Sequence, residues 1–172
     1  MRKQYKDFRA KSDKDSGEIT GYFSTYDRIP DSYGDIVAPG AFTETIRKRK
    51  ASGHPFPLCF NHDLDKIIGV VDPDDIRDTV KGPLMTARFF DTPLAQEKRA
   101  LVKQGVVFQF SFAYEVLDSA LVRLEDGTKA NELRKLELFE ISIVPIPANP
   151  RAIVVDVKRI KEAQLKYIRS IK

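Results

Sequence analysis

Three residues of the sequence could together activate a serine hydroxyl for nucleophilic attack: His62, Ser111 and Glu140. A serine hydroxyl is a weak nucleophile until a base accepts its proton. A neutral imidazole can do this near neutral pH, and a carboxylate behind the ring orients it and stabilises the imidazolium that forms. The order of the three along the chain is uninformative, because such triads occur in any order. These residue types predict hydrolase chemistry if the fold brings them together.

Ser111 lies in the segment GVVFQFSFAYEV, for which we expect a strand. Side chains alternate between the two faces of a strand. The alternation places Phe108, Phe110, Phe112, Tyr114 and Val116 on one face, and Gln109, Ser111, Ala113 and Glu115 on the other. A small hydroxyl beside Ala113, with an aromatic wall behind it, suits a reachable nucleophile.

Glu140 lies within the apolar run LELFEISIVPIP, which predicts a strand buried on both sides. The expected faces are Leu136, Leu138, Glu140, Ser142 and Val144 on one side, and Phe139, Ile141 and Ile143 on the other. A buried carboxylate is costly unless it is protonated or has a partner. An imidazolium is one candidate partner for Glu140, and an arginine or lysine side chain is the alternative.

His62, in CFNHD, is expected at a strand end or turn. The alternative to a catalytic role for it is that of an ordinary surface histidine. Cys59 is the alternative nucleophile, although a buried apolar role is favoured for it. Asp63 could replace Glu140 behind the imidazole, but neighbouring side chains of a strand diverge. His54, between glycine and proline, is expected in a loop. The backbone donors of an oxyanion hole leave no mark in a sequence.

The composition predicts one soluble domain with a sizeable core: 172 residues, 42% hydrophobic and 31% charged. The net charge of +4 comes largely from the two ends, which favours solvated basic segments over a nucleic-acid site. A single cysteine excludes an intramolecular disulfide, and neither a zinc pattern nor a glycine-rich phosphate loop is present. Without a signal peptide or a bilayer-length apolar run, we expect a cytoplasmic protein that needs no cofactor or metal.

The order of the expected elements predicts a mainly β fold. Strands are expected at residues 19–26, 56–61, 66–72, 83–90, 105–116, 133–144 and 152–157, and helices at 41–50, 92–104 and in the basic segment after 157. A polar loop at 28–40 and a charged hairpin around Glu125–Gly127 connect them. Many short strands with peripheral helices indicate a compact β-barrel or strongly curved sheet rather than a doubly wound parallel sheet.

Four segments resemble the prohead proteases of tailed bacteriophages that mature capsids of the HK97 type. They are GYFSTYDRIPDSYGDIVAPGAF at 21–42, FNHD at 60–63, FQFSFAYEV at 108–116 and LELFEISIVPIPANPRA at 136–152. They follow the order of that family and together span roughly residues 20 to 156. The resemblance implies a protease domain over residues 1–156 and a basic C-terminal helix or tail at 157–172. Ala113 departs from the glycine that family members often carry two residues after the serine.

The resemblance implies a barrel shared with herpesvirus assembly proteases (assemblins). It implies a serine endopeptidase with His62 as base, Ser111 as nucleophile and Glu140 as third member. The implied substrates are the scaffolding segment of the major capsid protein and the protease itself, inside a procapsid assembling in the host cytoplasm. The herpesvirus analogy adds a possible homodimer. The alternative function is an assembly factor of the same fold that binds capsid protein with little turnover. Nucleic-acid binding by the basic termini is a third and weaker hypothesis.

Overall fold

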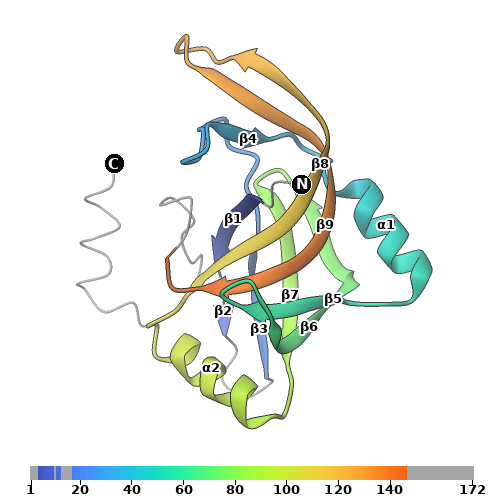
Figure 1. The fold of residues 1–172 in the computed structure, drawn as a ribbon, viewed down its shortest axis with the longest axis vertical. Helices are drawn as coiled ribbons and strands as arrows, with labels where there is room; N and C mark the ends of the chain where they lie inside the picture. Colours follow the sequence, from blue (N-terminus) through green and yellow to red (C-terminus); the bar gives the residue numbers. More distant parts are fainter. Residues whose placement is uncertain (1–3, 10, 13–16, 147–172) are drawn as a thin grey trace.

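A single curled sheet forms most of the computed structural model, which describes residues 4–9, 11–12 and 17–146 (Figure 1). In these residues the strands are β1 (Gln4–Arg9), β2 (Lys11–Ser12), β3 (Glu18–Tyr22), β4 (Asp35–Val37), β5 (Phe56–Phe60), β6 (Asp63–Thr79), β7 (Gly82–Phe89), β8 (Gln109–Arg123) and β9 (Lys129–Val144). They pair in the order β1-β8-β9-β5-β6-β7-β3-β2, and β4 pairs with β9 outside this path. The expected mainly β fold with peripheral helices is confirmed.

Two helices lie at the periphery of the sheet, α1 (Thr43–Ser52) and α2 (Pro93–Lys103) (Figure 1). Both were predicted. The hydroxyl of Thr92 caps α2 by accepting a hydrogen bond from the backbone N–H of Ala95, and Pro93 starts the helix without an unsatisfied donor. Gly105 closes the helix with φ of +70°. The strand expected at 152–157 and the basic helix or tail at 157–172 lie outside the described residues.

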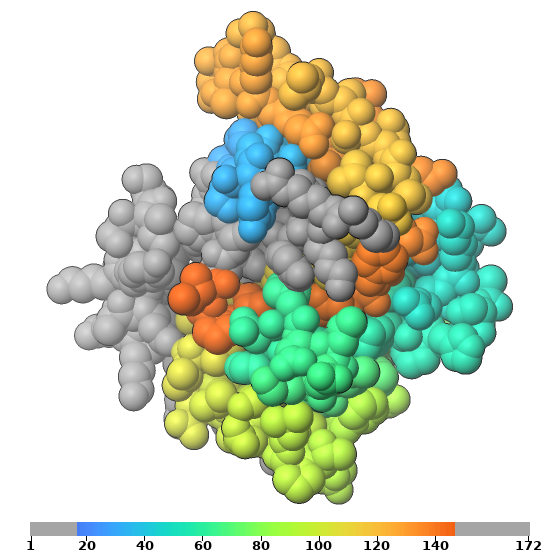
Figure 2. All heavy atoms as spheres, viewed as in Figure 1, coloured from blue at the N-terminus to red at the C-terminus, as the bar shows by residue number. Residues whose placement is uncertain are grey.

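Some strand boundaries differ from the expected ones. The strand expected at 19–26 ends at Tyr22, and β1 and β2 precede it. β6 runs from Asp63 to Thr79, well beyond the predicted 66–72. Between Val71 and Ile76 the register of its pairing with β7 shifts. Pro73 lies in this irregular stretch, where its lack of a backbone N–H breaks no regular ladder of hydrogen bonds. The hairpin predicted around Glu125–Gly127 joins β8 and β9 and projects from the body of the protein (Figure 2).

The polar loop before α1 holds a turn. One carboxylate oxygen of Asp31 accepts hydrogen bonds from the backbone N–H groups of Tyr33 and Asp35, both at 2.9 Å. The side chain of Asn131 donates to Asp35 across the β4–β9 pair. These contacts fix the loop against β9.

The aromatic side chains of β8 pack into the core. The ring of Phe112 lies edge-on to Phe23 and Phe42, with centroids 5.8 and 5.2 Å away, and is tilted against Tyr114. All four residues are essentially inaccessible to solvent. This packing fixes one face of β8, and therefore also the direction in which the opposite face points.

Replacing Phe112 with alanine should lower the free energy of unfolding by about 3–5 kcal/mol, the usual cost of removing a buried phenylalanine ring. Equilibrium denaturation in guanidinium chloride measures this. Val116→Ala, on the exposed part of the same strand, is the matched control and should change the free energy of unfolding by less than about 1 kcal/mol. Equal effects of the two substitutions would contradict the described packing.

Candidate active site

Ser111 lies on the face of β8 opposite the aromatic core. Phe110, Phe112 and Tyr114 all belong to the main hydrophobic cluster, as the predicted alternation requires. Ser111 pairs directly across the sheet with Ser142 of β9, and both are fully buried. The hydroxyl therefore faces away from the core, toward the part of the sheet where β5 ends.

Glu140 reaches the same face from β9, two residues before Ser142, and is only 2% exposed. One prediction for this strand is wrong, because Leu136 and Leu138 lie in the core rather than on the face of Glu140. Ala113 pairs with Glu140 while Tyr114 pairs with Leu138, so β9 carries one extra residue, Phe139. Such a bulge reverses the alternation of the strand beyond it.

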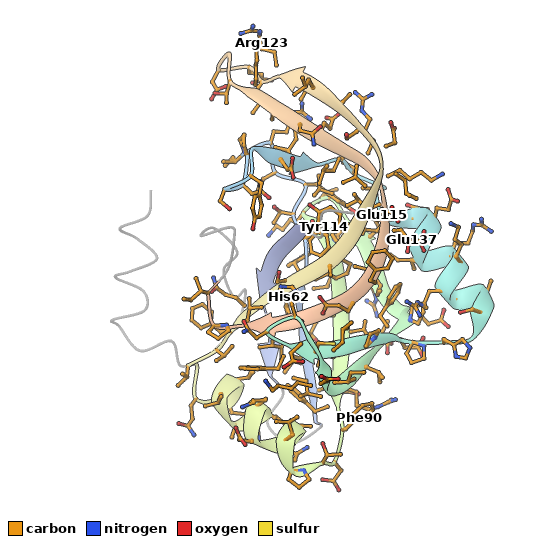
Figure 3. The ribbon with its side chains drawn as sticks, in the orientation of Figure 1. His62, Phe90, Tyr114, Glu115, Arg123 and Glu137 are labelled. Atoms are coloured by element: carbon orange, nitrogen blue, oxygen red, sulfur yellow. The ribbon has the colours of Figure 1, made fainter. Side chains whose placement is uncertain are left out.

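His62 comes from a tight turn between β5 and β6. Phe60 and Asp63 pair across this turn, and its two central residues, Asn61 and His62, have φ of 56° and 60°. Two-residue hairpins with positive φ at both central positions match the twist of the flanking strands. The backbone N–H of Asn61 donates to the carbonyl of Ile143 at 2.9 Å, so the turn is tied to β9. Figure 3 shows where His62 lies on the curled sheet.

The structure brings the three predicted residues into direct contact. Nε2 of His62 lies 2.7 Å from Oγ of Ser111, and Nδ1 lies 2.6 Å from Oε1 of Glu140. Because an ionised carboxylate can only accept, Nδ1 carries the proton and Nε2 is left to accept the serine proton. The imidazole is 16% exposed, whereas the carboxylate behind it is almost fully buried. This geometry can transfer a proton from Ser111 to His62.

Ser142 is a site residue to which the sequence analysis gave no role. Its Oγ accepts a hydrogen bond from the backbone N–H of His62 at 3.0 Å and donates one to Oε2 of Glu140 at 2.6 Å. The signal available in the sequence was its position two residues after Glu140, which puts two polar groups on one face of an apolar strand.

Asp63 and Cys59, the two alternative residues, are less suited to the reaction than Glu140 and Ser111. Asp63 forms an ion pair with Lys66 at 2.7 Å, which lowers the pKa of its carboxyl, and it is Glu140 rather than Asp63 that contacts Nδ1 of the imidazole. Cys59 is fully buried, and burial together with the adjacent Glu140 carboxylate raises the pKa of its thiol to about 12. A thiol is nucleophilic only when it ionises. The geometry therefore favours Ser111 over Cys59 as the attacking group.

Cys59 should consequently resist alkylation in the folded protein. At about pH 8 a thiol with this pKa remains protonated, and only the thiolate reacts with iodoacetamide. Mass spectrometry should find Cys59 unmodified in the native protein and fully alkylated in guanidinium chloride, and enzymatic activity should survive the native treatment. Rapid alkylation of the native protein, accompanied by loss of activity, would contradict this assignment.

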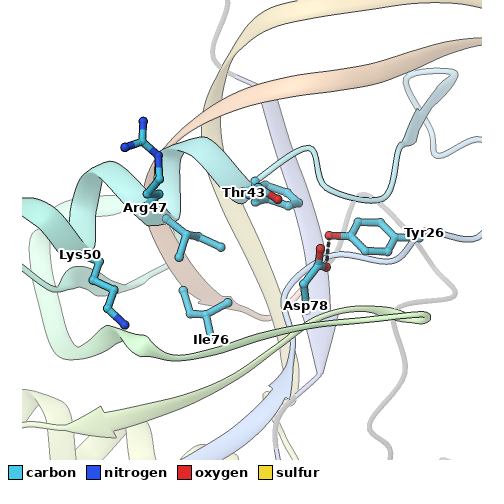
Figure 4. Close-up of a pocket in the computed structure, with 8 residues that line it drawn as sticks. Tyr26, Thr43, Arg47, Lys50, Ile76 and Asp78 are labelled. Carbon is cyan, nitrogen blue, oxygen red and sulfur yellow. Dashed lines mark hydrogen bonds between the residues drawn. The ribbon is translucent and has the colours of Figure 1, made fainter.

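A separate pocket of about 240 Å³ lies between α1 and β6, away from these residues (Figure 4). Its lining includes Tyr26, Ile46 and Asp78 but none of His62, Ser111, Glu140 and Ser142. The Tyr26 hydroxyl donates to Asp78, and burial with this partner raises the pKa of Tyr26.

Among the described residues, no cluster of three or more His, Cys, Asp and Glu side chains could hold a metal ion. The helices of this part of the chain are too short and polar to cross a membrane.

The comparisons with known proteins agree with each other. Residues 6–166 match the sequence model of a family described as caudovirus prohead serine protease. Among solved structures, the capsid assembly protease of bacteriophage T4 is similar, with a TM-score of 0.63 and 9% sequence identity, over 83% of this chain and 97% of that one. At this identity the likeness shows the fold alone. No curated protein matches the chain significantly.

Proposed function

The chain belongs to the caudovirus prohead serine protease family and is thus a serine protease of capsid maturation. We propose that it cleaves the scaffolding segment of the major capsid protein and its own chain. We further propose that His62, Ser111 and Glu140 carry out the reaction. The observation that supports this most strongly is the imidazole of His62, which bridges the serine hydroxyl at 2.7 Å and the carboxylate at 2.6 Å.

In the proposed mechanism, Oγ of Ser111 attacks the carbonyl carbon of the scissile peptide while Nε2 of His62 takes the hydroxyl proton. Glu140 stabilises the imidazolium without taking its proton. The imidazolium then gives that proton to the leaving amine, and the peptide C–N bond breaks to leave an ester on Ser111. A water molecule, deprotonated by His62, hydrolyses the ester, and the proton returns to Ser111.

Access to the nucleophile is a requirement of this proposal. Ser111 is fully buried, and the imidazole is the member of the triad that reaches the surface. A peptide can react only where Oγ of Ser111 becomes accessible to it, and we propose that this happens within an assembling procapsid in the host cytoplasm. We assign the protease domain to residues 1–156, and a homodimer is the proposed assembly state.

Expression of the capsid protein from the same phage, with and without this chain, tests the proposal. Intact-mass spectrometry should show a capsid protein shortened by a terminal segment only when the chain is present, and the chain itself should also lose residues. Full-length capsid protein in assembled shells under both conditions would contradict the proposal. That result would favour the alternative of an assembly factor that binds capsid protein without cleaving it.

A further inference from the structure

We propose that Ser142 is a positioning residue of the catalytic site, which holds the carboxylate of Glu140 and the backbone of His62 in one arrangement. This inference rests on the proposed mechanism and extends it from three residues to four. Ser142 touches neither the substrate nor the serine proton in this account. It acts through His62 and Glu140, because its hydroxyl contacts the backbone N–H of the first and the carboxylate of the second.

The direction of its two hydrogen bonds is fixed by chemistry. A backbone N–H can only donate, so the contact of 3.0 Å with His62 uses a lone pair of the Ser142 oxygen. The hydroxyl has one proton, and the contact of 2.6 Å with Oε2 of Glu140 uses it, because an ionised carboxylate can only accept. The polarity of the network therefore runs from His62 through Ser142 to Glu140 without ambiguity.

The carboxylate needs this second contact to stay in place. The terminal torsion of a glutamate side chain is broad, so a single hydrogen bond leaves the carboxylate plane free to turn. In the structure Oε1 of Glu140 accepts from His62 and Oε2 accepts from Ser142. With both oxygens engaged in a buried site, the acceptor for Nδ1 stays aligned with the ring.

The imidazole also needs a fixed backbone. A non-glycine residue with positive φ costs free energy and persists only where surrounding contacts hold it. His62 has φ of +60°, and its N–H is held by Ser142. The turn is held again one residue earlier by the bond from Asn61 to the Ile143 carbonyl. Ser142 therefore fixes both the backbone position from which the His62 side chain extends and the Glu140 carboxylate that the imidazole contacts.

The place of Ser142 in the sheet allows it to do both. It is the cross-strand partner of Ser111 on β8 and the parallel-strand partner of Cys59 on β5. Both neighbours are small, and the three residues are fully buried. Small side chains here leave room for the imidazole to cross from the turn to the nucleophile.

Substitution of Ser142 with alanine tests the inference, with a peptide that spans the mapped cleavage site as substrate. We expect kcat to fall by about 10- to 100-fold, because misplacement of a catalytic group by about 1 Å has an effect of this size. KM should change by less than about twofold, since no substrate contact is lost. The low-field NMR resonance of the His62 Nδ1 proton should move or broaden.

The matched control is Ser24→Ala, which removes another fully buried serine hydroxyl, one without a hydrogen-bond partner in the described part of the chain.

Conservative variants separate positioning from folding. Ser142→Cys has nearly the volume of serine and a weak donor, and Ser142→Thr keeps the hydroxyl, so each folded variant should retain more activity than Ser142→Ala. Wild-type kcat and an unchanged Nδ1 resonance in folded Ser142→Ala would overturn the inference, even if its Tm were lower. If that variant does not fold, a wild-type kcat and resonance in Ser142→Cys would overturn it. Failure of the mechanism itself would differ, because Ser111→Ala would then still cleave the peptide.

Discussion

Ser111→Ala should abolish cleavage of the capsid protein. The hydroxyl that the substitution removes lies 2.7 Å from Nε2 of His62 and is the group that would form the acyl-enzyme. Loss of the nucleophile of a serine protease lowers kcat by about 10⁴- to 10⁶-fold. Alanine fits the space of serine, and Ser111 contributes nothing to the aromatic core on the other face of β8. The variant should therefore fold and bind capsid protein, and mass spectrometry of co-expressed proteins should find only full-length chains.

Ser119→Ala is the matched control for this experiment. Ser119 lies on the same strand but is exposed, and its substitution should leave the rate of cleavage unchanged. Capsid protein that is still shortened by purified Ser111→Ala, at a rate within about tenfold of the wild type, would show that another residue is the nucleophile.

Glu140→Gln should lower kcat by about 10³- to 10⁴-fold, the effect expected when the imidazole loses its charged partner and the correct tautomer. The carboxylate receives two donors, Nδ1–H of His62 on one oxygen and the Ser142 hydroxyl on the other. An amide has only one oxygen and adds two N–H donors of its own. Either Nδ1 or Ser142 then lacks an acceptor in a buried site, and the imidazolium loses the negative charge that stabilises it. Steady-state kinetics with the mapped cleavage peptide measure the loss.

Glu137→Gln provides the comparison, because Glu137 lies on the same strand but its carboxylate contacts Lys48 and Thr45 of α1. It should retain wild-type kcat. If kcat fell by less than about tenfold in Glu140→Gln and by far more in Asp63→Asn, the carboxylate that stabilises the imidazolium would be that of Asp63.

The sequence was sufficient to predict on which face of its strand the Ser111 side chain lies. Strand alternation has a period of two, and no bulge interrupts β8 between Gln109 and Ala113. Large apolar residues alternate with small or polar ones along this stretch, so only one register buries the aromatic rings. The caps of α2 were equally predictable, since Thr92, Pro93 and Gly105 are each suited to one backbone position.

The faces of β9 could not be predicted in the same way. Leucine and isoleucine occur on both sides of Glu140, so hydrophobicity does not distinguish one register from another. The bulge at Phe139 therefore left no mark in the sequence, although it puts Leu136 and Leu138 into the core. The strand was predicted at residues 133–144, whereas it begins at Lys129, and the predicted alternation was continued through Phe139, where the structure breaks it.

The turn that carries His62 was predicted only as a strand end or turn. Asparagine at position 61 is typical of the left-handed region, but glycine is the usual residue at the next position of such a hairpin. A histidine there is accommodated because Ser142 and the Ile143 carbonyl hold the two backbone N–H groups. That support comes from a distant strand, so no local pattern could reveal it.

The most direct test of the central claim is to identify the residue that forms the covalent intermediate. A preparation that cleaves capsid protein is treated with a fluorophosphonate, digested with trypsin and mapped by mass spectrometry. We predict that one equivalent of reagent stops cleavage and that the adduct lies on Ser111, in the peptide of residues 104–123. Complete inhibition with the adduct on any other residue would contradict the account.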